Sequence, residues 1–232
     1  MFNRHIGIEI EVAEREEVSD NPNPSFWEKD YDGSVGIHPS LTEEDDEYYE
    51  DGGREFKFVK PLKGNDVVLA VDDLARYFAQ KGDFCEVEEV DAGYHLHIDY
   101  SEKRAKGYEF AEVVNSLYDW MKNIVSHERH NNHYCRYFDT LKDAEDNRYS
   151  WVNITGLLEN RRGTVEIRLH QSTKDADEIL TWAEFFSELA DCCDYMNLKP
   201  AKSKKDMVDI FNRMDISERT RERFAKALEK VS

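Results

Sequence analysis

Long hydrophobic runs, cysteine and proline are all scarce in this chain of 232 residues. No apolar stretch is long enough to span a bilayer, so we expect no membrane partner. The four cysteines form no C-x-x-C pair, and adjacent cysteines such as Cys192 and Cys193 rarely bridge each other, which fits a reducing compartment. The first twelve residues alternate polar and apolar side chains, unlike a signal peptide. We therefore expect a cytoplasmic protein.

Positive charge is also in short supply. Lysine and arginine together number 31 against 50 aspartates and glutamates, which leaves a net charge of −19. Such a chain repels phosphate backbones at long range, so non-specific nucleic-acid binding is not expected, although a local basic pocket can still hold a nucleotide. Hydrophobic residues at 40% are sufficient for a folded chain of this length to form one sizeable core.

The periodicity of apolar residues predicts a mixed order of strands and helices. The predicted strands are residues 5–12, 54–59, 84–90, 94–100, 150–156 and 163–170, with 84–90 and 94–100 forming a hairpin. The predicted helices are residues 65–80, capped by Asn65, then 108–127 and 175–196, and two short C-terminal helices that separate near Asp215. Residues 13–53 are polar and predict a long loop with at most one short strand, and residues 131–149 stay unassigned. This order favours a single α+β domain with a mainly antiparallel sheet and helices on one face.

Four of the predicted strands have an apolar face and a face of reactive side chains. Residues two apart on a strand share a face, so each reactive set projects together. The four sets are Glu9 and Glu11; Glu55 and Lys57; His95, His97 and Asp99; and Thr164, Glu166, Arg168 and His170.

A single strand of this kind is most simply interpreted as a solvated surface. Four together favour a metal site if they lie in one sheet, because clustered carboxylates need a cation or a shifted pKa. Carboxylate oxygens with an occasional imidazole suit Mg²⁺ or Mn²⁺.

The order of these motifs resembles the amidoligase family, in the superfamily of glutamine synthetase and glutamate–cysteine ligase. The motifs, which cover roughly residues 5–190, are G-I-E-I-E, D-G-S, A-G-Y-H-L-H-I-D, Y-C-R-Y, V-N-I-T and T-V-E-I-R-L-H-Q-S-T. The resemblance implies a glutamine synthetase-like catalytic domain over residues 1–196, with 197–232 as a helical extension of the same domain. It also implies a ligase that uses ATP and Mg²⁺ or Mn²⁺ to join a carboxylate to an amine through an acyl phosphate.

The resemblance also implies roles for individual residues. The implied metal ligands are Glu11 and Glu55 for one ion, and Glu9, His97 and Glu166 for the other. The implied catalytic and substrate-positioning residues are Arg168 at the phosphates, Arg136 beside it, and Asp32 and Ser34 of the D-G-S element. His95 and Asn153 match in position and are grouped with Arg168 as cofactor-binding residues, without individual roles. An acidic insertion before Glu55 leaves open whether a neighbour such as Glu50 takes its place.

Other functions remain open at this point. The same metals without ATP would give an amide or ester hydrolase, and loss of catalysis would leave a binding module. A cupin-type oxygenase is disfavoured by the many amphipathic helices. The sequence contains no P-loop, so ATP rests on the resemblance alone. The carboxylate and amine substrates are not specified, and either a monomer or a homodimer is compatible with the motif set. The acidic run at residues 43–51 is expected to be a solvated loop.

Overall fold

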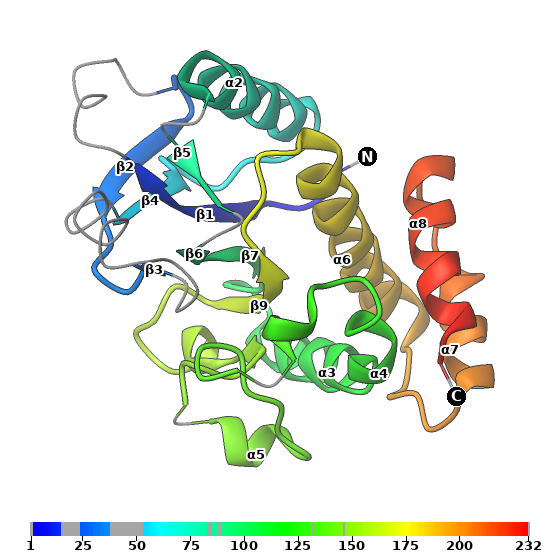
Figure 1. The fold of residues 1–232 in the computed structure, drawn as a ribbon. Coiled ribbons are helices and arrows are strands. Elements are labelled where there is room, and N and C mark those ends of the chain that lie inside the picture. Colours follow the sequence, from blue (N-terminus) through cyan, green and yellow to red (C-terminus); the bar gives the residue numbers. More distant parts are fainter. Residues whose placement is uncertain are drawn as a thin grey trace.

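A computed structural model describes residues 2–14, 24–37, 53–82, 85–87, 90–130, 132–145 and 147–231. It confirms an α+β fold built on one antiparallel sheet with the strand order β2-β4-β1-β7-β9-β8 (Figure 1). These strands are β1 Ile6–Glu14, β2 Trp27–Tyr31, β4 Gly53–Phe58, β7 Gly93–Asp99, β8 Val152–Asn153 and β9 Thr164–Gln171. A short strand, β5 Cys85–Glu86, also pairs with β1. A separate pair is formed by β3 Gly36–Ile37 and β6 Val90–Asp91.

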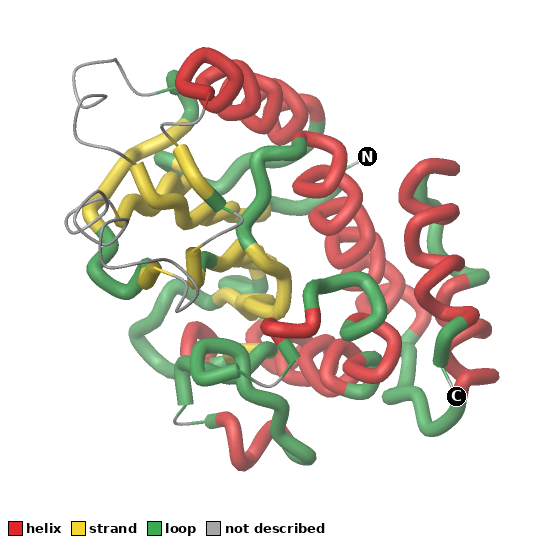
Figure 2. Tube along the Cα trace, viewed as in Figure 1, coloured by secondary structure: helices red, strands yellow, loops and turns green. Residues whose placement is uncertain are grey.

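Helices cover one face of the sheet (Figure 2). The described helices are α2 Asn65–Lys81, α3 Arg104–Asn115, α4 Tyr118–Met121, α5 Leu141–Ala144, α6 Ala176–Met196, α7 Lys204–Phe211 and α8 Glu218–Glu229. Single turns of 3-10 helix lie at His127–Arg129 and Thr155–Leu157. The helix α6 contacts α2, α3 and α8, and α8 lies on the side of α6 away from the sheet (Figure 1).

The core follows from the alternation in the first strand. Ile6, Ile8, Ile10 and Val12 of β1 are fully buried and belong to one hydrophobic cluster that also includes α6 and the C-terminal helices. The ring of Phe224 on α8 stacks on Phe185 of α6, with ring centroids 3.9 Å apart. Burying a phenylalanine side chain contributes about 2–3 kcal/mol to the stability of the fold, so this pair stabilises the packing of α8 on α6.

Two details of the predicted helices are wrong. The predicted helix 108–127 begins earlier, at Arg104, and breaks after Asn115. The Asn115 side chain donates to the Phe138 carbonyl and accepts from the Trp151 indole, and Ser116 Oγ donates back to the Val113 carbonyl. Such local side-chain bonds compete with a continuous helix. The cap of the helix at 65–81 is Gly64 at a φ of 63°, and Asn65 is the first helical residue.

The predicted hairpin of residues 84–90 and 94–100 is also wrong. In the described part of this segment, β5 pairs with β1 and β6 pairs with β3. Both edges of β7 are already occupied, by β1 and by β9. The polar segment 13–53 contains two strands, β2 and β3, where at most one was predicted. The acidic run at 43–51 lies outside the described residues.

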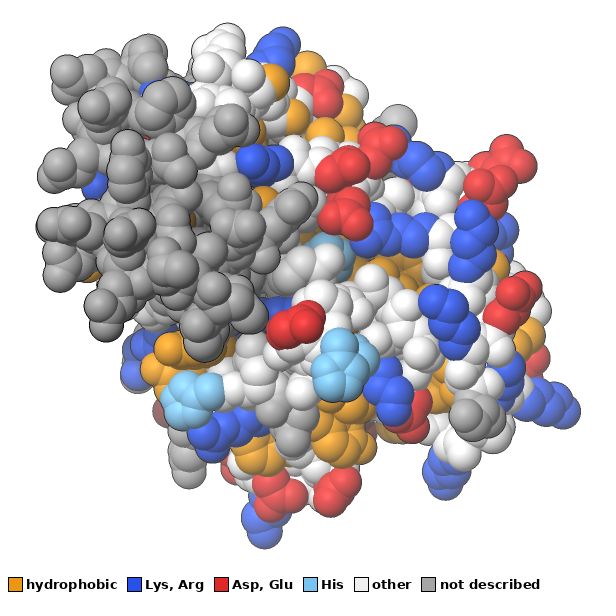
Figure 3. All heavy atoms as spheres, in the orientation of Figure 1, with side chains coloured by type: hydrophobic (Ala, Val, Ile, Leu, Met, Phe, Trp, Pro, Cys, Tyr) orange, Lys and Arg blue, Asp and Glu red, His pale blue; other side chains and the backbone are white. Residues whose placement is uncertain are grey.

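The described surface is rich in charge. Side chains of both signs lie over the C-terminal helices on the face drawn in Figure 3, with hydrophobic side chains between them. None of the described helices combines the length and the apolar character that a membrane crossing requires.

Candidate active site

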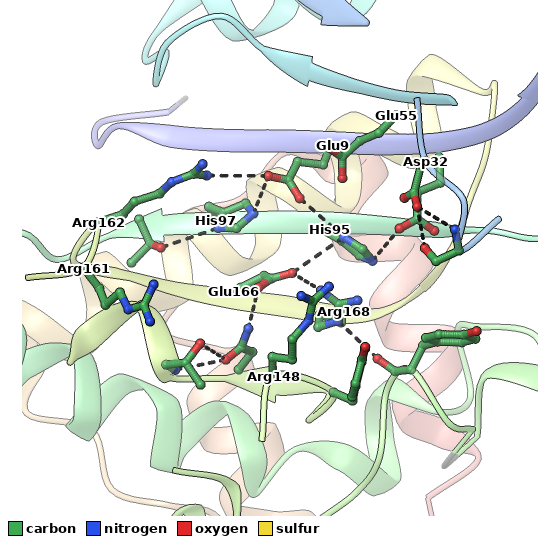
Figure 4. Close-up of a pocket in the computed structure, with 18 of the residues that line it drawn as sticks. Glu9, Asp32, Glu55, His95, His97, Arg148, Arg161, Arg162, Glu166 and Arg168 are labelled. Carbon is green, nitrogen blue, oxygen red and sulfur yellow. Dashed lines mark hydrogen bonds and ion pairs between the residues drawn. The ribbon is translucent and has the colours of Figure 1, made fainter. Parts of the chain in front are cut away.

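The register of the sheet brings the four reactive strand faces together. Across the neighbouring strands β4, β1, β7 and β9, Glu11 pairs with Glu55 and Glu9 pairs with His95. His97 pairs with Glu166 on the next strand boundary. The condition set by the sequence, that these side chains share one sheet, is therefore met (Figure 4).

A cavity of about 810 Å³ lies over this face. Its acidic and histidine lining is Glu9, Glu11, Asp32, Glu55, His95, His97, Glu145 and Glu166. Its arginine lining is Arg129, Arg148, Arg161, Arg162 and Arg168. Ser34 and Asn153 also line it, so most of the predicted site residues meet in one place. The volume suits a cofactor or a small substrate.

His95 occupies the centre of the carboxylates. Its Nδ1 atom lies 3.5 Å from Glu9 Oε2 and 3.6 Å from Glu166 Oε1, and its Nε2 atom lies 3.5 Å from Glu11 Oε1. The side chain is buried, and within the described part of the chain Nδ1 has no hydrogen-bond partner. A buried nitrogen without a partner is costly, so a ligand at Nδ1 would relieve a real deficit.

Two groups of side chains can each hold a divalent ion. The first group is Glu9, His95 and Glu166, and the second is Glu11, Glu55 and His95. A neutral imidazole has one nitrogen lone pair, so His95 can serve only one group at a time. The orphaned Nδ1 atom faces the first group, so an ion bound there would leave the Nε2 proton directed toward Glu11 in the second.

Glu166 is held in place from both sides. Asn153 Nδ2 donates to Glu166 Oε2 at 2.6 Å, and Arg168 Nη1 donates to Oε1 at 2.5 Å. Asn153 is itself fixed, because its Oδ1 accepts from the backbone and hydroxyl of Thr155. Burial opposes ionisation, but His97, Arg168 and His95 together lower the pKa of Glu166 below its ordinary value. Glu166 is therefore a charged, pre-oriented candidate ligand.

Glu55 has the opposite environment. Burial raises its pKa to about 7, and the carboxylates of Glu9, Glu11 and Asp32 add to the shift against the opposing effect of His95. Asp32 Oδ1 accepts from the Ser34 backbone at 2.8 Å and from its hydroxyl at 2.7 Å, which closes the D-G-S turn beside Glu55. A divalent cation between these carboxylates would remove the repulsion.

The division of ligands differs from the one that the resemblance implies. His95, rather than His97, belongs to the group with Glu9 and Glu166 whose ligand atoms lie close enough to share an ion. His97 Nε2 instead lies 3.1 Å from Glu9 Oε1. Burial opposes protonation there, yet the carboxylates of Glu166 and Glu9 raise the pKa of His97 above its ordinary value. A β-carbon on Gly93 would lie 2.7 Å from His95 Nε2, so glycine leaves room for this imidazole.

The two predicted arginines have different surroundings. Arg168 is buried, and its guanidinium binds Glu166 and, through Nε at 3.1 Å, the Tyr134 carbonyl. Arg136 is exposed and shares a hydrogen bond of 2.6 Å with His133, outside the described lining of the cavity. The fold therefore places Arg168 beside Glu166, whereas Arg136 is not among the described residues that line the cavity.

The prediction that His170 shares the reactive face is wrong. The pairing of β7 with β9 shifts register between Tyr94 and Leu96, and this bulge turns His170 toward the helices. Its ring packs edge-on against Trp182 of α6 with centroids 4.7 Å apart. Arg129 Nη2 donates to the Arg168 carbonyl at 2.8 Å and supports the bulge. Burial lowers the pKa of His170 to about 4.

Four arginines of the cavity were missed by the sequence analysis. Arg161 and Arg162 directly precede the G-T of the last predicted strand, and a pair of cations at the entry to a reactive strand was a usable signal. Arg148 lies in a segment without clear periodicity, and Arg129 reaches the cavity because of its contact with the bulge in β9. The sequence around neither arginine therefore indicated a place in the site.

The donor chemistry of both groups fits Mg²⁺ or Mn²⁺. Carboxylate oxygens dominate, one imidazole is present, and the orphaned Nδ1 atom of His95 faces two carboxylates. The fit rests on these residues alone, because the chain matches no model of a known protein family and no curated protein.

Proposed function

We propose that the chain is a carboxylate–amine ligase that depends on ATP and a divalent metal. The observation that carries the proposal is the buried, unpartnered Nδ1 of His95 between Glu9 and Glu166, with a second carboxylate group beside it in the same cavity. The motif order that resembles the amidoligases supports the ligase chemistry over other metal-dependent reactions.

The position of each residue in the cavity suggests its role in the proposed reaction. Glu9, His95 and Glu166 would hold one divalent ion, and Glu11 with Glu55 would hold the other. Bound ions neutralise the phosphate oxygens and the charge that develops during phosphoryl transfer. Asn153 and Arg168 keep Glu166 in one orientation, which avoids reorganisation during the reaction.

The proposed reaction has two steps. A carboxylate oxygen of the substrate bonds to the γ-phosphorus of ATP, and ADP leaves. The amine then attacks the acyl carbon, an amide forms, a proton is released, and inorganic phosphate leaves. Asp32 and Ser34 sit at the cavity wall beside Glu55, where the polar turn can position one of the substrates.

Release of ADP tests the proposal. The protein is incubated with ATP, Mg²⁺ or Mn²⁺, and pools of carboxylates and amines, and ADP and phosphate are followed. We expect ADP release that requires a carboxylate and an amine together. Glu166→Ala should lower it by about a thousandfold or more, because it removes a metal ligand from phosphoryl transfer. Glu109→Ala is the matched control, since Glu109 is an exposed residue of α3 paired with Lys106.

A metal-dependent hydrolase is the second candidate. It is favoured by Glu55, whose pKa of about 7 suits a general base at neutral pH. Hydrolysis of an amide or ester that requires metal and proceeds without ATP would assign this function. Absence of both ATP binding and ADP release in the presence of either metal would contradict the ligase.

A further inference from the structure

The cavity is lined by three exposed arginines, two of which lack an acidic partner among the described residues. Arg148 and Arg161 are exposed, and no carboxylate of the described residues lies within ion-pair distance of either. Arg162 is also exposed, with a side chain 77% accessible, and its Nη1 lies 3.9 Å from Glu9 Oε1. In a chain where acidic groups outnumber basic ones by 50 to 31, Arg148 and Arg161 are cations of the cavity that have no paired carboxylate among the described residues.

The turn that presents Arg161 and Arg162 is held by another arginine. Arg104, at the start of α3, donates through Nη1 to the carbonyls of Leu157 at 2.8 Å and Leu158 at 2.6 Å. Its Nη2 donates to the Arg161 carbonyl at 2.7 Å. A planar guanidinium can bind several carbonyls at once in a fixed geometry, which a lysine cannot do.

Glycine at the end of this turn makes the clamp possible. Gly163 has a φ of 80°, and its backbone N–H donates to the Gly156 carbonyl at 2.8 Å. A β-carbon at Gly163 would lie 2.4 Å from the Ser101 Cα atom, so the turn packs closely against the segment that precedes α3. The backbone of the arginine pair is therefore set before any ligand arrives, which lowers the entropic cost of binding.

We propose that Arg148, Arg161 and Arg162 form a binding site for a polyphosphate chain, and that Arg104 is the residue that positions it. The proposal rests on the proposed function in that the chain would belong to the nucleotide triphosphate. Figure 4 shows Arg161 and Arg162 entering the cavity on one side of Glu9 and Glu166, with Asp32 and Glu55 on the other.

The number and position of the cations define the ligand class. Three separate guanidiniums that line one cavity suit a ligand with several negative charges along its length, whereas a monocarboxylate would engage one of them. Arg168, which the motifs assign to the phosphates, is already bound to Glu166 and the Tyr134 carbonyl. The exposed arginines retain their donors for an anion.

Tripolyphosphate without metal or nucleoside is the probe. Calorimetric titration should show binding to the wild-type chain that weakens with added salt. The double variant Arg161→Gln and Arg162→Gln should lose about tenfold or more in affinity, since the loss of even one charge-assisted contact is worth about that factor. The matched control, Arg76→Gln with Arg219→Gln, makes the same change in net charge on α2 and α8 and should bind like the wild type.

Arg104 is tested separately, because both cavity arginines remain in its variants. Arg104→Gln should weaken tripolyphosphate binding about fivefold by loosening the turn, and Arg104→Lys should restore part of the loss. If Arg104→Gln or Arg104→Lys folds and binds tripolyphosphate with the affinity of the wild type, Arg104 is only a structural residue and its positioning role is overturned. A lowered melting temperature of the variant would not change that conclusion.

The outcomes separate this inference from the ligase proposal. Tripolyphosphate binding that follows the predicted pattern, with neither ATP binding nor ADP release in the presence of either metal, would keep the anion site and contradict the ligase. Absence of tripolyphosphate binding, or equal binding by the double variant, would overturn the anion site even where ADP is released.

Discussion

Buried histidines occur on both faces of the sheet, and their surroundings differ. His95 on the polar face is surrounded by three carboxylates and has an unpartnered Nδ1. His170 on the helix face has both nitrogens engaged, with Nδ1 at 2.7 Å from the Gln171 carbonyl and Nε2 at 3.4 Å from Arg223 Nη2. Aromatic rings enclose it, and its pKa is lowered to about 4. His95 therefore has a nitrogen that a ligand could engage, whereas His170 is a neutral part of the core.

The largest expected effect is on ADP release, when a candidate metal ligand of the polar face is removed. His95→Ala should lower ADP release about a thousandfold or more, because it removes a ligand from the group that also contains Glu9 and Glu166. Steady-state kinetics with Mg²⁺ measures this. The melting temperature in the absence of metal is the control. Activity near that of the wild type would show that His95 is a structural residue.

The core histidine should make stability sensitive to acid. Its folded-state pKa of about 4 lies below the ordinary value of 6.5, so the unfolded chain binds more protons between these values. The contribution is fully present above about pH 6.5 and falls as the pH drops toward 4, by roughly 3 kcal/mol. Denaturant unfolding across this range, compared with His170→Gln, measures the difference. Parallel pH curves for the two proteins would contradict the assignment.

A smaller effect is expected at Glu55. Because neighbouring carboxylates and burial raise its pKa to about 7, an ionised Glu55 is unfavourable without a cation. Glu55→Gln should therefore stabilise the metal-free protein at pH 8 by roughly 1 kcal/mol, allowing for partial solvent screening. Thermal unfolding with and without Mn²⁺ checks this, since the same variant should lose part of the stabilisation by metal. A less stable metal-free variant would argue against repulsion at this position.

The smallest effect is expected at Arg136. It lies outside the described lining of the cavity and shares a hydrogen bond with His133. Arg136→Gln should change the rate of ADP release by no more than about twofold. A large loss would restore the role that the motif resemblance implies and would mean that this segment approaches the site during the reaction.

Local patterns predicted the parts of the molecule that depend on neighbouring residues. The alternation from Ile6 to Val12 placed Glu9 and Glu11 on one face of a strand, and the D-G-S residues form the turn that their types favour. The outward orientation predicted for His170 failed because it depends on a bulge between two distant strands. The same holds for the clamp by Arg104, whose carbonyl partners lie more than fifty residues along the chain.

Titration with Mn²⁺ tests the central claim most directly. By calorimetry or by the electron paramagnetic resonance signal of free Mn²⁺, the wild-type chain should bind two ions, one for each carboxylate group. His95→Ala should lose the ion held by Glu9 and Glu166 and retain weaker binding at Glu11 and Glu55. Absence of Mn²⁺ binding by the wild type, or equal stoichiometry and affinity in His95→Ala, would contradict the account of the polar face as a metal centre.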